Sequence, residues 1–401
     1  MSHVNTALKV RAPAPKTSTP SPDWAAKWAA FKATFPHQRR PYSSREWGGP
    51  AHSMCSYQGK MKPALAHHLL EVFTKPGNVV VDPFSGCGTI PFEACRMGRL
   101  GYGIDISRLG HVLTLGKVGK PTAAKLERLL IDLDAFLDSY KVTAADQAGA
   151  AAIKFNSAIP DYFHVDTLRE VIAARHFFLS KWDSGPEWAL AYSSTMHLLH
   201  GNRPYALSRN SHPVTPYSPT GPFEYRALMP RLRDKLQRLK PEIDNTDRSF
   251  GGSTQGDCTA TWPTAIPTAD VILTSPPFFA STRFYMTNWM RFWFSGWERA
   301  DFDLKPADYV ETRQKANLDV YLNFFAAARE RLTDNGLLVL HLGDSKKCDM
   351  GAELSKRVDP WFTIEDCFTE SVEHCESHGI RDKGTVTGHT YLVLRASSRD
   401  S

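Results

Sequence analysis

The sequence predicts an α/β fold built on a doubly wound, mostly parallel sheet with a helical and loop-rich insertion. Two observations predict this architecture. Short apolar runs typical of buried strands alternate with segments of helical period at both ends of the chain, and that alternation favours a parallel sheet. Residues 141–250 lack the alternation, which indicates an insertion in the main fold.

The composition is that of an ordinary globular protein. Of the 401 residues, 42% are hydrophobic and 22% are charged, and the length allows a large core with two or three domains. No apolar run approaches the ~18 residues needed to span a bilayer, and the N-terminus lacks the apolar region of a secretory signal. The seven cysteines form no C-x-x-C pair. We therefore expect a cytoplasmic protein without a membrane segment, a disulfide framework or a metal site.

The first 22 residues are expected to form a disordered basic arm, because they are rich in proline, alanine, serine and threonine. Residues 1–40 hold seven lysines and arginines against the single acidic residue Asp23, and this excess equals the net charge of +6 of the whole chain. A polyanion is the natural partner of such an arm, and a solubilising tail is the alternative.

The N-terminal part of the main domain is predicted at residues 23–119. Pro22 and Asp23 suit the start of a helix, and Pro63 suits the first turn of another. The β-branched run NVVVD is typical of a buried strand. The order of expected elements is a helix at 22–35, a helix at 63–73, a strand at 78–82, a helix at 91–98 and a strand at 102–106.

The inserted region is predicted at residues 120–250. It begins with a segment of strong helical period and contains a second helix, at 166–179, with a Thr167/Glu170 capping box. A loop rich in proline, aromatic residues and arginine (201–226) and a basic helix (230–240) follow. The loop and the basic helix are candidate nucleic-acid contacts, and a solvated surface is the alternative.

The alternation of strands and helices resumes in the C-terminal part, residues 251–397. The aromatic run at 281–297 is expected to be mainly core, because its Trp and Phe spacing is typical of packing. Arg283 and Tyr285 are the best exceptions and could line a binding pocket. The order of expected elements is a strand at 270–274, a helix at 318–332, a strand at 336–343 and a strand at 389–395.

The turn after the 78–82 strand has the features of a ligand site. Ligands of open α/β sheets bind outside the carboxyl ends of the strands. In VVVDPFSGCGTIPFEA, Gly86 and Gly88 let the backbone approach a ligand closely, and Asp82 can accept hydrogen bonds. Asp105, which closes the next strand, is placed for a ribose diol. Neither G-x-G-x-x-G nor G-K-[ST] is present, so a pyrophosphate cradle is not expected.

DPFSGCGT followed by GRLGYGIDIS resembles the first two cofactor motifs of the amino-group DNA methyltransferases, which methylate N4 of cytosine or N6 of adenine. The resemblance implies the seven-stranded class I methyltransferase fold, S-adenosyl-L-methionine as the cofactor and a bacterial, archaeal or phage origin. SYQGKMKPALAHHLLEVF is similar to the motif that holds the methionine end of the cofactor. The cofactor-binding residues implied are Lys60, Lys62, Asp82, Pro83, Phe84, Gly86, Gly88, Thr89, Asp105 and Asp257.

SPPF at 275–278 resembles the catalytic [DNS]-P-P-[YF] motif of the same family, and the motif order is similar to that of its α group. An exocyclic amine of a nucleobase is a poor nucleophile, because its lone pair is delocalised into the ring. Ser275 Oγ and the Pro276 carbonyl are candidate acceptors that would draw the amine towards tetrahedral geometry, with Pro277 stiffening the segment. Phe278 offers an aromatic face for a flipped base.

The sequence therefore predicts a site-specific DNA methyltransferase acting on N4 of cytosine. Ser275, where adenine enzymes of the family more often have Asp or Asn, favours cytosine. No cysteine follows a proline, which argues against methylation of cytosine carbon 5. The alternatives are an N6-adenine DNA methyltransferase, an RNA base-amine methyltransferase and a catalytically silent nucleic-acid-binding relative. Double-stranded DNA is the expected partner, and a cognate restriction endonuclease is a possible second one.

Overall fold

The computed structural model of this chain describes residues 23–44, 47–245, 247–279, 284–345, 347–371 and 386–398. The basic arm expected at 1–22 and Arg283 of the aromatic run lie outside the described residues, so both stay predictions.

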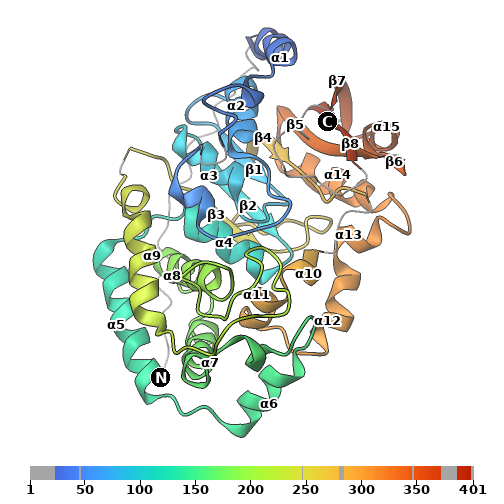
Figure 1. Cartoon of the computed structure of the whole chain (residues 1–401). Coiled ribbons are helices and arrows are strands. Elements are labelled where there is room, and N and C mark those ends of the chain that lie inside the picture. Colours follow the sequence, from blue (N-terminus) through green and yellow to red (C-terminus); the bar gives the residue numbers. More distant parts are fainter. Residues whose placement is uncertain are drawn as a thin grey trace, which may run out of the picture.

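A mixed sheet forms the centre of the molecule (Figure 1). Its strands are β1 (Val79–Asp82), β2 (Leu100–Asp105), β3 (Gly252–Gln255), β4 (Ala269–Thr274), β5 (Leu332–Ser345), β6 (Cys348–Asp349), β7 (Phe362–Ser371) and β8 (Val386–Ala396). They follow the order β3-β2-β1-β4-β5-β8-β7, with the short β6 paired to β5. Neighbours from β3 to β5 are parallel, whereas β8 is antiparallel to β5 and β7. The predicted doubly wound, mostly parallel seven-stranded sheet is confirmed.

The central strands are apolar on both faces, as strands covered by helices on each side must be. On β4, Val271 and Leu273 belong to one core, and Ile272 between them belongs to the other. The first core is completed by α1 (Asp23–Thr34), α2 (Pro63–Phe73) and α3 (Thr89–Arg96). The second is completed by α14 (Val320–Glu330) and α15 (Met350–Ser355).

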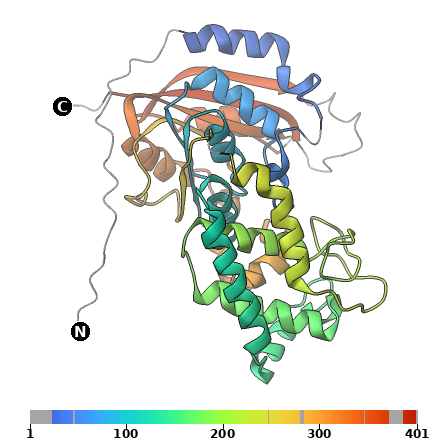
Figure 2. The ribbon, with the colours of Figure 1, turned by 90° about the vertical axis from the view of Figure 1, so that its left-hand side faces the viewer.

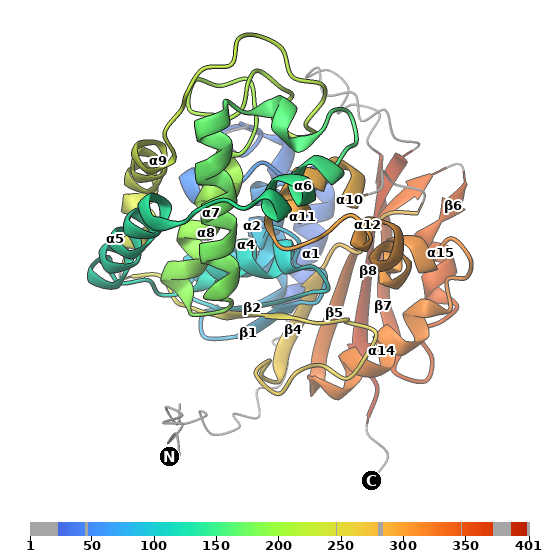
Figure 3. The same ribbon diagram turned by 90° about the horizontal axis from the view of Figure 1, so that it is seen from below.

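A third core belongs to the helices between β2 and β3, which are α4 (Arg108–Val118), α5 (Ala123–Ser139), α6 (Ala144–Ala152), α7 (Val165–Ser180), α8 (Pro186–Leu198) and α9 (Leu228–Ile243). Helix α4 packs against α8 and also against β2 and β3, so it joins this helical body to the sheet. Figures 2 and 3 show α5 to α9 gathered on one side of the sheet. Among the helices of the described residues, none combines the length and the apolar character needed to cross a membrane.

Short helices fill the connection from β4 to β5. The aromatic side chains of this segment, among them Trp289, Trp293 and Trp297, are buried in the third core, which confirms the packing role expected for the aromatic run. Tyr285 lies half-buried against the same core. The short helices of this connection are α10 (Phe284–Thr287), α11 (Trp289–Phe294), α12 (Asp301–Leu304), η4 (Lys305–Asp308) and α13 (Val310–Arg313). Three further 3-10 helices lie earlier in the chain, namely η1 (Pro36–Gln38), η2 (Pro50–Ser53) and η3 (Ile159–Tyr162).

Several elements were not expected from the sequence, among them α4, α6, α8, α15 and the edge strands β3 and β7. Helix α8 is buried on all sides, so its sequence has no polar face and no helical period. Strands β3 and β7 lie at the two edges of the sheet, where polar side chains replace the apolar run of a central strand.

The capping box predicted for the 166–179 helix was wrong. Helix α7 begins at Val165, and its N-cap is His164, whose Nδ1 accepts from the Asp166 amide. Thr167 instead exchanges two hydrogen bonds with the backbone of Arg226, and Glu170 accepts from the Leu228 amide. Both residues therefore anchor the start of α9, because a tertiary partner competes for groups that could have capped the helix.

Glycine at position 101 of β2 is expected to be required for packing of the sheet against α3. A Cβ there would lie 2.0 Å from the Pro91 carbonyl oxygen, so Gly101→Ala must move backbone and should cost about 1–3 kcal/mol or more in the free energy of unfolding. Gly149→Ala in α6 is the control, because the nearest atom is 3.9 Å away and the helix should gain about 0.5–1 kcal/mol. Urea denaturation measures both, and equal midpoints would contradict the packing argument.

Candidate active site

The carboxyl ends of β1 and β4 are joined by a buried hydrogen bond. Parallel pairing sets Val81 beside Ile272, so the strands end together at Asp82 and Thr274. The Thr274 hydroxyl donates to Asp82 Oδ1 over 2.6 Å, and the Phe84 amide donates to the same atom over 3.1 Å. Burial raises the pKa of Asp82 to about 7, although both hydrogen bonds oppose the shift. This carboxylate therefore ties the glycine-rich turn to the segment that begins at Ser275.

The turn after β1 leaves no room for side chains at its two glycines. Gly86 and Gly88 have φ angles of 50° and 70°, in the left-handed region. A Cβ at Gly86 would lie 2.9 Å from the Tyr57 hydroxyl, and one at Gly88 would lie 2.8 Å from Thr114 Cα. The following Thr89 is buried in the first turn of α3. Both glycines are therefore required by their left-handed backbone and by the close packing of the turn on Tyr57 and Thr114.

Asp105 fixes this turn from the end of β2. Its Oδ2 accepts from the Gly86 amide over 2.8 Å, and its Oδ1 accepts from the amide and hydroxyl of Ser107 over 2.8 and 2.6 Å. Burial raises the pKa of Asp105, while the Ser107 and Gly86 donors act in the opposite direction. Since a carboxylate has about four acceptor positions, one remains for a ligand hydroxyl.

Asp257 lies next to Asp105 through the backbone, because the Gly256 amide donates to the Asp105 carbonyl over 2.9 Å. The Asp257 carboxylate accepts from the amide and hydroxyl of Thr259, and from Arg313 Nη1 over 3.2 Å. Asp82, Asp105 and Asp257 are thus linked along one edge of the sheet by β1, β2 and the segment after β3.

The remaining residues predicted to bind the cofactor divide into two groups. Lys60 points inwards, since its Nζ donates to the His52 carbonyl over 2.8 Å, and Pro83 is buried. In contrast, Lys62 is exposed just before α2, and the Phe84 ring packs on Phe324 with centroids 5.4 Å apart. The structure therefore ties the Lys60 ammonium to the His52 carbonyl and buries Pro83 within the turn, whereas the side chains of Lys62 and Phe84 are directed elsewhere.

The Ser-Pro-Pro-Phe segment is held by hydrogen-bond partners from two other parts of the chain. Gln314, directly after α13, donates from Nε2 to the Pro277 carbonyl over 3.1 Å and to the Phe278 carbonyl over 3.4 Å. Ser275 Oγ lies 3.1 Å from His341 Nδ1 on β5. Within the described residues, the Pro276 carbonyl has no hydrogen-bond donor. Ser275 and Pro276 therefore carry the acceptors of this segment that are left for a substrate.

Three buried residues that support the site were not expected from the sequence. Gln314 and His341 hold the Ser-Pro-Pro-Phe segment, and Lys117 of α4 donates from Nζ to the Cys87 carbonyl over 2.5 Å, within the glycine turn. The only signal for His341 is a polar residue within the apolar run GLLVLHLG. Burial lowers the pKa of Lys117.

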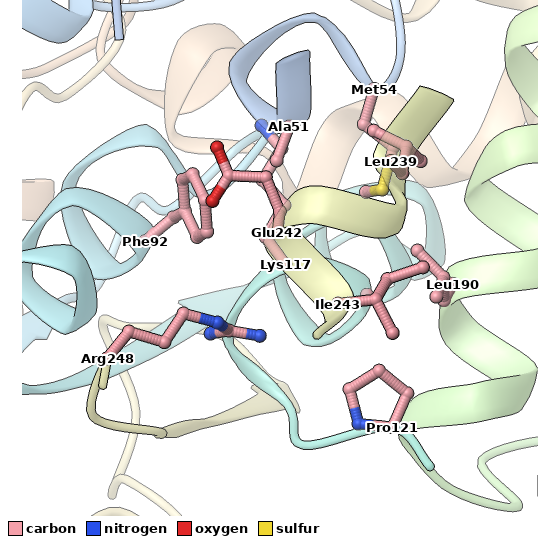
Figure 4. Close-up of a pocket in the computed structure, with 11 residues that line it drawn as sticks. Ala51, Met54, Phe92, Lys117, Pro121, Leu190, Leu239, Glu242, Ile243 and Arg248 are labelled. Atoms are coloured by element: carbon pink, nitrogen blue, oxygen red, sulfur yellow. The ribbon is translucent and has the colours of Figure 1, made fainter. Parts of the chain in front are cut away.

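A small cavity lies behind the glycine turn, between η2, α3, α4 and α9 (Figure 4). Its polar lining comes from Lys117, Glu242 and Arg248, and burial raises the pKa of Glu242. None of the residues predicted from the sequence lines it. The candidate site is therefore the strand-end edge and not this cavity.

Comparison with known proteins relates the cofactor segment to a family. Residues 9–109 match the family model described as DNA methylase, and this range contains the glycine turn and Asp105. The Type II methyltransferase M.MjaII of Methanocaldococcus jannaschii is 32% identical over 91 residues, which are 23% of this chain and 17% of that protein. These matches support the amino-group methyltransferase family expected from the sequence, without deciding between N4 and N6, and S-adenosyl-L-methionine as its cofactor.

Solved structures give weaker likenesses. TrmN from Thermus thermophilus is 15% identical, with 89% of this chain and 54% of that chain covered, at a TM-score of 0.35. The rRNA methyltransferase aviRa from Streptomyces viridochromogenes is 12% identical, with 89% and 94% covered, also at a TM-score of 0.35. Scores this low carry no weight for the fold or the function of this chain.

The residues present fit S-adenosyl-L-methionine. The turn after β1 has no side chain at Gly86 or Gly88, so its backbone amides and carbonyls are not covered by side chains of these two residues. Asp105 keeps an acceptor position for a ribose hydroxyl.

Asp82 should make the stability of the protein depend on pH. The pKa of Asp82 is raised on folding, so ionisation of this carboxyl favours the unfolded chain. The wild-type free energy of unfolding should therefore fall as pH rises from about 4 to about 7. Asp82→Asn keeps an oxygen acceptor for Thr274 and Phe84, so its advantage over wild type should grow by up to about 1.4 kcal/mol per pH unit in that window. Urea denaturation of the cofactor-free protein measures this difference.

Asp134→Asn, on the exposed face of α5, is the matched control and should run parallel to wild type at every pH. Parallel profiles for wild type and Asp82→Asn would contradict the ionisation of a buried carboxyl at this site.

Proposed function

We propose that this chain is an S-adenosyl-L-methionine-dependent methyltransferase that modifies the exocyclic N4 amine of a flipped cytosine in a specific sequence of double-stranded DNA. The observation that carries the proposal is the Thr274–Asp82 hydrogen bond. It holds the family-matched cofactor turn against the segment that starts with Ser275, the residue after Thr274. A cofactor site and a set of rigid acceptors thereby share one sheet edge, as direct methyl transfer requires.

The cofactor would be held by the backbone of the glycine turn, by Asp105 at the ribose, by Asp257 at the adenine end and by Lys60 at the carboxylate. When bound, S-adenosyl-L-methionine supplies a sulfonium methyl group as the electrophile. Lys117 holds the Cys87 carbonyl and Asp105 holds the Gly86 amide, so the turn is preorganised by fixed partners on two sides.

The acceptors proposed for the target amine are Ser275 Oγ and the Pro276 carbonyl. The next two carbonyls, of Pro277 and Phe278, already accept from Gln314. This supports the Pro276 carbonyl, and not the Pro277 carbonyl, as the acceptor for the target amine. Two acceptors on one amine would orient its hydrogens and direct its lone pair at the methyl group. The Phe278 ring is half-buried against His341 and His389, with centroids 5.7 and 6.0 Å away.

N6 of adenine is the second candidate target, because the matched family covers both amines. Cytosine is favoured by the single neutral hydroxyl of Ser275. A restriction endonuclease partner also remains a proposal, supported by the Type II name of the archaeal relative.

The loop at 201–226 is the proposed target-recognition surface of the inserted region. It exposes the aromatic rings of Tyr217, Phe223 and Tyr225, each more than half accessible. Its backbone is fixed to the segment after the catalytic motif, because Trp289 donates to Pro216 and Arg291 donates to Val214 and Pro213. Exposed rings on a rigid loop suit stacking on bases and packing in a groove.

The basic helix α9 is a weaker candidate for DNA contact than this loop. Arg233 pairs with Glu127, Lys240 pairs with Asp244 and Lys235 donates to the Ser53 carbonyl. These cations already have partners in the protein, so a phosphate would have to replace them.

The proposed reaction predicts N4-methylcytosine as the product. The full chain should transfer labelled methyl groups from S-adenosyl-L-methionine to unmethylated plasmid DNA, and nucleoside mass spectrometry identifies the base. Ser275→Ala should slow single-turnover transfer by ~10²-fold or more while calorimetry shows unchanged cofactor binding. N6-methyladenine as the product would overturn the assignment of the base and keep the mechanism, whereas 5-methylcytosine would overturn both. Label in added RNA with none in DNA would overturn the assignment of DNA as the substrate.

Arg203 and Arg209 of the loop should differ when replaced by alanine. Arg203 is exposed, so Arg203→Ala should weaken DNA binding and lower the slope of log K against log salt by about 0.9 if it meets one phosphate. Arg209 donates to the Gly221 and Asp161 carbonyls and stacks on Phe223 at 4.2 Å, so Arg209→Ala should lower the melting temperature as well. Fluorescence anisotropy and thermal melting separate the effects, and identical behaviour of the two variants would refute the assignment.

A further inference from the structure

A histidine that no cofactor or substrate role requires lies directly behind Ser275. His341 sits in the middle of β5, is 5% exposed, and has its Nδ1 3.1 Å from Ser275 Oγ. Its Nε2 is buried and has no hydrogen-bond partner among the described residues. The imidazole is therefore tied to the protein by one polar contact, and that contact is the first residue of the catalytic motif.

If Ser275 Oγ accepts from the target amine, the proton of its own hydroxyl must be donated to another acceptor. A serine hydroxyl has one donor and two acceptor lone pairs, and accepting from an amine requires the lone pairs to face the substrate. The proton must then point away, towards a group that can accept it. Nδ1 of His341 is the one side-chain partner of Ser275 Oγ within the described residues.

We infer that His341 is a positioning residue that accepts the hydroxyl proton of Ser275, so that Oγ faces the substrate as an acceptor, and that it receives the proton released on methylation. This inference rests on the proposed function for its substrate. The pairing of Ser275 with His341 is independent of which nucleobase amine is methylated.

The proton transfers balance. Attack of the amine nitrogen on the sulfonium methyl forms the N–C bond, breaks the C–S bond and leaves a methylated nitrogen with one proton too many. That N–H bond breaks as its proton passes to Ser275 Oγ, while the original Oγ–H bond breaks and its proton passes to His341 Nδ1. Serine is regenerated, and His341 carries the positive charge until it loses the proton to solvent.

The surroundings of His341 keep it neutral before the reaction, as a proton acceptor must be. Burial holds the pKa of His341 well below its usual value, and His389 and His37 act in the same direction. The titratable groups facing it from β8 are His389 and Tyr391, with ring centroids 4.7 and 5.3 Å away. Glu370 of β7 accepts from the Tyr391 hydroxyl over 2.6 Å and makes no hydrogen bond to His341.

The first test does not require activity. In the full chain with ¹⁵N-labelled histidine, the signals lost in His341→Asn identify His341. We expect the tautomer with the proton on Nε2 and with Nδ1 as a hydrogen-bonded acceptor, and Ser275→Ala should shift the Nδ1 resonance. A proton on Nδ1, or no response to Ser275→Ala, would overturn the inference.

The second test separates proton transfer from simple positioning. Single-turnover transfer to unmethylated plasmid DNA is followed from pH 5 to pH 8 for wild type, His341→Asn and His341→Leu. Asparagine can bond to Ser275 but cannot take a proton, so we expect a loss of ~10²-fold or more for both variants, with unchanged KM for DNA and cofactor. Because burial holds the pKa of His341 well below its usual value, the wild-type rate should stay level over most of this range and fall only towards its acid end, and the variants should lack that fall.

Full recovery of the rate in His341→Asn would overturn the proton-acceptor role. His197→Asn, which removes a half-buried histidine on α8 away from the catalytic segment, is the control for lost packing and should keep the wild-type pH profile. If the wild-type chain methylates neither DNA nor RNA, the proposed function fails, and the tautomer measurement still decides the pairing of His341 with Ser275.

Discussion

The hydrogen bond from the Thr274 hydroxyl to the buried Asp82 carboxylate is the contact on which the site depends. Two loops with separate tasks leave the sheet at β1 and β4, and a parallel register alone aligns their strands without fixing the loops. Asp82 does so by accepting from both segments at one oxygen. A carboxylate is costly to bury, so its presence here is better explained by the need for a two-sided acceptor than by stability.

How far the fold followed from the sequence depended on how each element is buried. The central strands β1, β4 and β5 carry apolar residues on both faces, and such runs are visible without any partner. Edge strands β3 and β7 take half their environment from solvent, so their sequences look like loops. Helix α8 was missed for the opposite reason, because burial on every side left its sequence without a helical period of apolar residues. Thr167 and Glu170 satisfied a local capping rule but found tertiary partners.

The site followed from the sequence where one short segment carries the chemistry. Asp82, Gly86, Gly88 and Asp105 were recognisable because a strand, a turn and the next strand are contiguous in the chain. His341 and Gln314 were not, because each acts on a loop that precedes it by tens of residues. Arg209 lies in the loop that the sequence offered as a nucleic-acid contact, yet its guanidinium already bonds to the carbonyls of Gly221 and Asp161.

The end of helix α13 has a consequence for how the two halves of the site communicate. Arg313 binds Asp257 and its neighbour Gln314 binds the Pro277 and Phe278 carbonyls, so two consecutive residues contact both the proposed adenine end of the cofactor site and the proposed catalytic segment. Under the proposed function, a cofactor that displaced Arg313 from Asp257 would also act on Gln314, the next residue in the chain. Such coupling is reciprocal. The free energy of cofactor binding and the free energy of target-base binding would therefore belong to a single thermodynamic cycle.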